Sequence, residues 1–222
     1  MQGQISESDI FLVASSEGNI TTGSGNATVT LPSGIKDGDF VLFHFGADTT
    51  ANWDTSTLVQ TSNWETFQSW NGGSSKPATQ NACKFIADAS AETSILVDKD
   101  GSFTIQWICS VWRNVDPVDY GEEFIGADAT TQKTLADAIP NGPSITTNTD
   151  KAVVISTFIN KAGWSSPPPT LAGYTLVEYA NYTGDMAQAY KQVDVAGSEN
   201  PGTWGQTTAG KHWILTIALR RA

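Results

Sequence analysis

Tryptophan is the residue type of this sequence that is best placed for binding chemistry. Four of the eight tryptophans lie in polar segments rich in Gly, Ser and Pro, namely Trp53, Trp70, Trp164 and Trp204. An indole ring can stack on the C–H face of a sugar while neighbouring Asn, Asp and Ser side chains bind the hydroxyls. Tryptophan is also enriched in subunit interfaces, and a large ring can equally close one end of its own β-sandwich. A sugar site, an interface and a core lid are therefore three interpretations that stay open.

Two acidic residues in one turn are candidates for metal binding. Asp98 and Asp100 stand in the segment Asp-Lys-Asp-Gly, which reads first as a hairpin turn. Carboxylates at this spacing also suit Ca²⁺, although the acid that closes an EF-hand loop would fall on Cys109. A looser, loop-borne Ca²⁺ site at these two residues stays a candidate. The adjacent pair Glu122 and Glu123 would point to opposite faces of a strand, unlike the facing carboxylates of a glycosidase.

The residues that could serve as base or nucleophile lie in apolar strand-like segments. His44 and His212 are the two histidines, and such positions are typical of packed, hydrogen-bonded imidazoles. Cys83 and Cys109 alternate with apolar residues, which indicates buried free thiols, with a disulfide open if their strands are neighbours. The sequence contains no Gly-x-Ser-x-Gly elbow, no phosphate-binding glycine motif and no Cys-x-x-Cys pair. We therefore predict that the chain is not an enzyme and needs no cofactor beyond the candidate Ca²⁺.

The segments that would position these side chains read as short β-strands. Residues 40–45, 152–158 and 213–219 are rich in β-branched and aromatic residues, and 102–112 alternates apolar with polar ones. Gly, Pro, Asn and Asp turns separate them. Only 130–138 has a helical pattern. We predict an all-β fold, a β-sandwich of jelly-roll type built from two internally repeated halves.

The repeat is visible as segments that recur in the same order. Residues 82–92 align with 189–199, and 108–113 with 215–220, each pair 107 positions apart. The matching central strands are 39–43 and 151–155, and upstream Trp53 aligns with Trp164 and 63–65 with 173–175. We predict repeats over 27–115 and 116–222, which either form two sandwiches or interleave in one domain. Residues 1–26 are expected to form an attachment arm or a first strand.

Charge and hydropathy narrow the possible partners. The 222 residues include 12 Lys and Arg against 23 Asp and Glu, which gives a net charge of −11. A nucleic-acid partner is disfavoured, because such binding depends on basic residues that neutralise phosphates. No apolar run reaches the roughly 18 residues of a membrane helix, and the first residues lack the basic region of a signal peptide. We therefore expect that the protein is made in a cytoplasm and does not insert into a membrane.

Both repeats run through the same succession of segments. It consists of a strand after a Gly-Asp or Asp-Lys turn (38–42 and 150–154), an aromatic segment (Trp64 and 173–175), Cys-Lys-Phe or Tyr-Lys-Gln followed by Ala-x-x-Glu (83–92 and 190–199), and a last strand that ends at 112–116 or 219–220. This succession resembles the duplicated β-sandwich segments of virion surface and tail-fibre proteins of tailed bacteriophages and prophages. The resemblance extends from about residue 38 to the end of the sequence.

The resemblance implies a structural protein of a phage virion, either a capsid decoration or a tail or fibre component. Its partners would be other virion proteins and copies of itself in a homo-oligomer, with a trimer favoured. The alternative is a carbohydrate-binding or adhesion module that uses the loop tryptophans on a host surface glycan.

Overall fold

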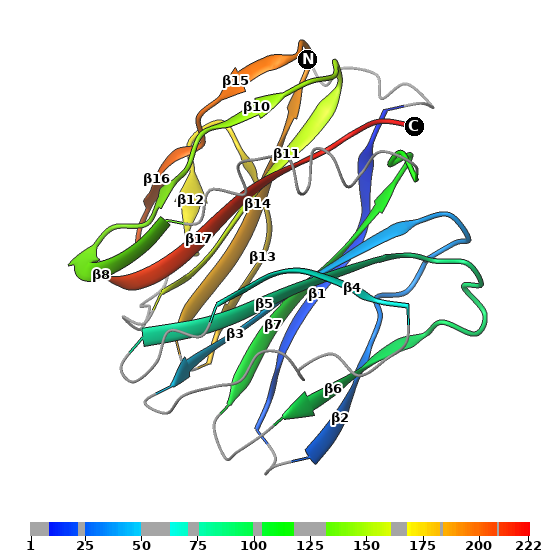
Figure 1. The fold of residues 1–222 in the computed structure, drawn as a ribbon, viewed down its shortest axis with the longest axis horizontal. Coiled ribbons are helices and arrows are strands. Elements are labelled where there is room, and N and C mark those ends of the chain that lie inside the picture. The colour runs from blue at the N-terminus through cyan, green and yellow to red at the C-terminus, as the bar shows by residue number, and fades with distance from the viewer. Residues whose placement is uncertain are drawn as a thin grey trace.

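The computed structural model describes residues 9–21, 25–49, 63–70, 76–99, 104–117, 132–160, 168–182, 184–207 and 209–222. Seventeen β-strands and no helix are found among these residues (Figure 1). The predicted all-β, sandwich-like fold is confirmed.

The first half of the chain builds one five-stranded antiparallel sheet, the first main sheet. Its strand order is β1-β7-β3-β5-β4, with bounds Phe11–Ile20, Ile105–Arg113, Phe40–Thr49, Lys76–Phe85 and Glu65–Trp70. A two-stranded sheet of β2 (Gly25–Thr30) and β6 (Ser94–Lys99) packs on one face of it.

The second half builds the second main sheet, in the order β8-β17-β11-β14-β13. The bounds are Gln132–Ala138, Gly210–Leu219, Ala152–Asn160, Asp185–Val193 and Thr175–Asn181. Its outer face is covered by small sheets: β10 (Ile145–Thr147) with β15 (Gly197–Glu199), and β12 (Thr170–Leu171), β16 (Gly202–Gly205) and β9 (Asn141–Gly142).

The two main sheets have equivalent strand orders and registers. Strands β8, β17, β11, β14 and β13 take the places of β1, β7, β3, β5 and β4. In the first sheet Leu42 pairs with Cys83, and in the second Ile155 pairs with Tyr190. Edge strands β4 and β13 each carry a bulge at the corresponding step. Cys83 and Tyr190 are 107 positions apart, as in the sequence alignment, so this equivalence supports the repeat interpretation.

A turn contact outside the sheets recurs in the same way. The Ala89 backbone N–H donates to Asp37 Oδ1 at 2.8 Å, and the Ala196 N–H donates to Asp150 Oδ1 at 2.7 Å. In each half the acidic residue precedes the central strand of the main sheet and fixes the turn that follows β5 or β14. A side-chain acceptor of this kind satisfies a loop N–H that no ladder can reach.

The predicted helical pattern at 130–138 is wrong. Residues Gln132–Ala138 form strand β8, which pairs with β17. Pairing with a buried strand outweighs the weak local preference of this segment for a helix.

Within residues 1–26, Phe11–Ile20 form strand β1 of the first main sheet. Strand β1 pairs along β7 from Phe11 opposite Arg113 to Ile20 opposite Ile105. Gly25 and Asn26 already belong to β2. Residues 1–8 lie outside the described part.

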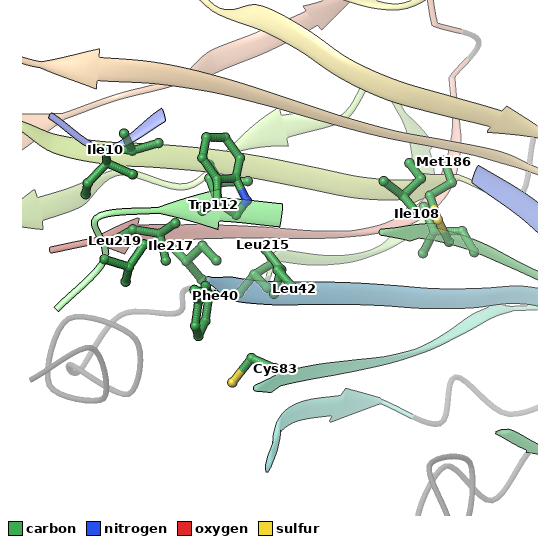
Figure 2. Packing of buried hydrophobic residues seen from close by; sticks show 14 of the residues in the cluster. Ile10, Phe40, Leu42, Cys83, Ile108, Trp112, Met186, Leu215, Ile217 and Leu219 are labelled. Atoms are coloured by element: carbon green, nitrogen blue, oxygen red, sulfur yellow. The ribbon is translucent and has the colours of Figure 1, made fainter. Parts of the chain in front are cut away.

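The largest apolar cluster lies between the two main sheets. Figure 2 shows Phe40, Leu42, Ile108 and Trp112 of the first half together with side chains of the second, including Leu215, Ile217 and Leu219. Both halves therefore share one interior. Figure 1 shows the resulting layers, with β2 and β6 at one side and β10 and β15 at the other. Strands β3 and β11 are covered on both faces, which explains why they read as continuous apolar runs.

The facing sheets interlock through side chains of unequal size. Gly46 pairs with Gln106 in β7, and Ile159 pairs with Trp213 in β17, so Gly46 and Ile159 hold equivalent positions. A Cβ atom on Gly46 would clash with the Ile159 side chain and lie 2.6 Å from Met186 Cε. The glycine is therefore required by the close approach of the opposite sheet.

Candidate functional site

Trp204 is an interior residue. It lies in β16 with no exposed surface, and its ring meets the Phe158 ring edge-on at 4.8 Å between centroids. Leu171 and Ile214 belong to the same cluster. Among the three interpretations, this burial supports the core lid, and it contradicts Trp204 as a ring that stacks on a sugar.

The other predicted binding rings cannot be placed in a site. Trp53 and Trp164 lie outside the described residues, and so does Asp100. Trp70 is the last residue of β4, and its side chain is not among those described.

Asp98, the other acidic candidate, is half-buried in β6 and lies opposite Asn26 of β2. In the described segments, no three side chains of His, Cys, Asp or Glu gather as a metal site would require. The Ca²⁺ site at Asp98 and Asp100 stays a prediction.

His44 is held between the main sheets as a neutral, packed imidazole. Its Nδ1 lies 2.5 Å from Asn81 Oδ1, and its ring stacks on Trp213 at 5.5 Å with an interplanar angle of 16°. Burial lowers the pKa of His44 to about 4, because the cation would lose its hydration, although the Asn81 hydrogen bond favours protonation. The second half has a polar pair at the equivalent place, where Gln188 Nε2 donates to Thr157 Oγ1 at 3.3 Å.

His212 shows the same kind of environment on the other side of the second main sheet. It is buried, and its Nδ1 lies 3.0 Å from the carbonyl oxygen of Gly210. Both histidines are thus buried strand residues with a hydrogen-bond partner, which is Asn81 of the neighbouring strand for His44 and Gly210 of its own strand for His212.

Both cysteines are buried free thiols, which confirms the favoured interpretation. Cys83 belongs to the cluster between the main sheets, whereas Cys109 belongs to the cluster on the opposite face. Strand β3 also separates their two strands. Burial raises the pKa of both thiols well above the usual range.

A charged cluster recurs in both halves, and sequence reasoning did not single it out. In the first half, Lys84 Nζ lies 2.8 Å from Glu92 Oε2 beside Trp64; these three residues form the Trp64 cluster. In the second half, Tyr174, Lys191 and Glu199 form the Tyr174 cluster. The Lys and Glu of the two clusters are 107 positions apart. This recurrence within the aligned segments is the signal that could have revealed them.

In the Tyr174 cluster, the Tyr174 hydroxyl itself hydrogen-bonds the Glu199 carboxylate. Lys191 Nζ donates to Glu199 Oε1 at 2.8 Å and to Oε2 at 3.0 Å, and the Tyr174 hydroxyl donates to Oε1 at 3.2 Å. The Lys191 ammonium also lies 5.9 Å from the centre of the Tyr174 ring. Burial and the Glu199 carboxylate raise the pKa of Tyr174 well above its usual range, so this hydroxyl keeps its proton.

The Trp64 cluster instead borders a hollow. This Trp64 hollow has a volume of about 350 Å³ and is lined by Leu31, Asn63, Trp64, Lys84, Ala91, Glu92 and Ser94. Lys84 and Glu92 expose only 10% and 23% of their side chains. The indole of Trp64 packs edge-on against the Phe43 ring, with 5.6 Å between the ring centroids, and this contact holds the indole in place. The hollow therefore offers an anchored aromatic ring beside a partly desolvated ion pair.

The outer strands of the main sheets form a second candidate surface. Ser15 Oγ of β1 donates to Glu178 Oε1 of β13 at 2.8 Å, so these two outermost strands lie on the same side of the molecule. The Tyr182 hydroxyl, next to β13, donates to Glu17 Oε1 of β1 at 3.3 Å. We refer to this side as the β1–β13 edge.

Compared with known proteins, the chain matches no family model, no curated protein and no solved structure. The resemblance to phage virion segments therefore stays a prediction. The described segments include no helix with the length and hydropathy of a membrane span.

Proposed function

We propose that this chain is a non-enzymatic structural protein that acts through protein–protein assembly. In the setting that the sequence resemblance implies, it is a component of a tailed-phage virion, either a capsid decoration or a part of the tail or fibre. Its partners are then other virion proteins and further copies of itself, with a trimer as the favoured oligomer.

The observation that carries this proposal is the β1–β13 edge. Among the described strands, β1 ends the first main sheet and β13 ends the second. An outermost strand presents backbone N–H and C=O groups that another chain can pair. Leu176 on β13 is 36% exposed, which adds an apolar contact to these polar groups. Two neighbouring edges of 10 and 7 residues are a surface on which copies can associate.

The experiment is a measurement of mass in solution by light scattering on the full chain and two variants. Leu176→Lys places a charge on the edge strand, where it opposes strand addition. Val195→Lys is the matched control, because Val195 is 69% exposed on the turn between β14 and β15. We expect an oligomer for the natural chain and for Val195→Lys, and at least about tenfold weaker association for Leu176→Lys, or about 1.4 kcal/mol.

One result would contradict assembly itself, and another would contradict the β1–β13 edge as its surface. The natural chain could have the mass of one protomer at every concentration, or both variants could associate equally with circular dichroism unchanged. The second of these results would leave assembly standing but would remove the β1–β13 edge as its surface.

A carbohydrate-binding function is the second candidate, and one observation favours it. The burial of Trp204 removes one of the predicted rings, but the Trp64 hollow provides a different aromatic site.

A further inference from the structure

The second half shows which chemical group completes a Lys–Glu pair at this position. In the Tyr174 cluster, the Glu199 carboxylate accepts two hydrogen bonds from Lys191 and a third from the Tyr174 hydroxyl. A partly buried carboxylate is stabilised by such donors, because each one replaces a water molecule that burial has removed. A neutral hydroxyl group therefore fits beside this ion pair.

The first half has the same pair but no hydroxyl in its aromatic residue. Trp64 precedes β4 as Tyr174 precedes β13, and Lys84 and Lys191 occupy matching positions in β5 and β14. Glu92 lines the hollow together with Lys84 and the indole. A hydroxyl supplied from outside can therefore take the part that the Tyr174 hydroxyl has in the second half.

The composition of the hollow selects the class of ligand. A simple anion is disfavoured, because Glu92 already neutralises Lys84 at 2.8 Å. An apolar ligand is disfavoured, because it would strip water from the ion pair without returning hydrogen bonds. A neutral polyol with one apolar face satisfies both the ring and the charges.

We propose that the Trp64 hollow binds a neutral sugar ring. The C–H face of a pyranose stacks on the Trp64 indole, and one sugar hydroxyl donates to Glu92. Lys84 and the side chain of Asn63 bind other oxygens of the same ring. A volume of about 350 Å³ lies in the range of small-molecule sites, and it suits one or two sugar units.

The test is a titration of the full chain with glucose, galactose, mannose, N-acetylglucosamine and their disaccharides. Tryptophan fluorescence and the NMR signals of the indole N–H groups report binding. The informative variant is Trp64→Tyr, which gives the first half the hydroxyl that closes the Tyr174 cluster. The matched control is Tyr174→Phe, which removes the corresponding hydroxyl from the second half and leaves the Trp64 hollow intact.

We expect at least one of these sugars to bind saturably, with a dissociation constant at or below about 10 mM. Trp64→Tyr should weaken that binding at least about tenfold, and Tyr174→Phe should leave it unchanged. The absence of saturable binding by every sugar of the panel overturns the inference, as does equal binding by Trp64→Tyr. If Trp64→Tyr does not fold, Glu92→Gln provides the same test through its carboxylate, again with an expected loss of about tenfold.

The sugar-binding test is independent of the proposed assembly. Trp64 and Glu92 do not belong to the β1–β13 edge, so Trp64→Tyr should keep the oligomeric mass and Leu176→Lys should keep the sugar binding.

Discussion

The Trp64 cluster and the Tyr174 cluster place the same two charges at equivalent points of two equivalent sheets, yet only the second is complete. Tyr174 supplies a hydroxyl to Glu199, whereas Trp64 stands beside a hollow that Glu92 also borders. At this equivalent position, the aromatic residue therefore decides whether the carboxylate accepts a hydrogen bond from the chain's own hydroxyl or borders a hollow. The interior shows a similar divergence, with His44 and Asn81 where the second half has Thr157 and Gln188.

The largest expected effect comes from exchanging the interior pair of the first half for that of the second. The unfolded chain binds a proton at His44 near the ordinary pKa of 6.5, whereas the folded chain does so only near 4. Between these values the unfolded state holds more protons, so stability falls as the pH falls. His44 should contribute a loss of about 2.5 kcal/mol between about pH 7.5 and pH 4.5.

The double variant His44→Thr/Asn81→Gln should remove this part of the pH dependence. Urea unfolding at both pH values measures how the free energy of unfolding changes with pH. At about pH 7.5, where His44 is neutral in both states, the difference between the natural chain and the double variant reports only the packing cost of the exchange. A double variant with the same pH dependence as the natural chain would show that His44 is not held neutral between the sheets.

A smaller effect is expected where the sheets interlock. Gly46→Ala places a methyl group against Ile159 and Met186 and should lower the free energy of unfolding by about 2 kcal/mol. Ile159→Val in the same chain makes room, so the two costs should sum to more than the cost of the double variant. Thermal or urea unfolding of the four chains measures this coupling. Strict additivity would mean that the two residues do not touch.

The sequence predicts the strand-rich fold better than it predicts the site. Alternation and turn residues are local signals, so they identify strands such as β7 and β17 correctly. The polar strand β8 and the start of the chain were harder, because their partners are distant segments. The burial of Trp204 was not predicted for a similar reason. Its Gly and Thr neighbours suggest a loop, but β16 packs on a face of the second main sheet.

The contacts inside the two charged clusters depend on the fold, although the recurrence of their Lys and Glu is visible in the sequence. Lys84 and Glu92 are eight positions apart across the turn after β5. Strand periodicity alone does not predict that residues at this separation contact each other. The aromatic residue comes from a third segment, before β4. The recurrence at a constant offset was available in the sequence, but the contact itself depends on how the turn folds back.

The smallest expected effect is a difference in stability between the two clusters. Glu199→Gln loses charge from a carboxylate with three hydrogen bonds and should cost about 1–2 kcal/mol. Glu92→Gln affects a carboxylate with one ion-pair contact, to Lys84 at 2.8 Å, and should cost less than Glu199→Gln. Urea unfolding of both variants tests this order. A larger loss at Glu92 would contradict the view that the first cluster is the open one.

The mass of the full chain in solution, measured by analytical ultracentrifugation over a wide range of concentrations, tests the assembly function most directly. The account predicts a discrete oligomer, with a trimer favoured, and a parallel run in EDTA reports whether a Ca²⁺ site such as the one predicted at Asp98 and Asp100 supports it. A single-chain mass at every concentration would contradict self-assembly as the function of this protein.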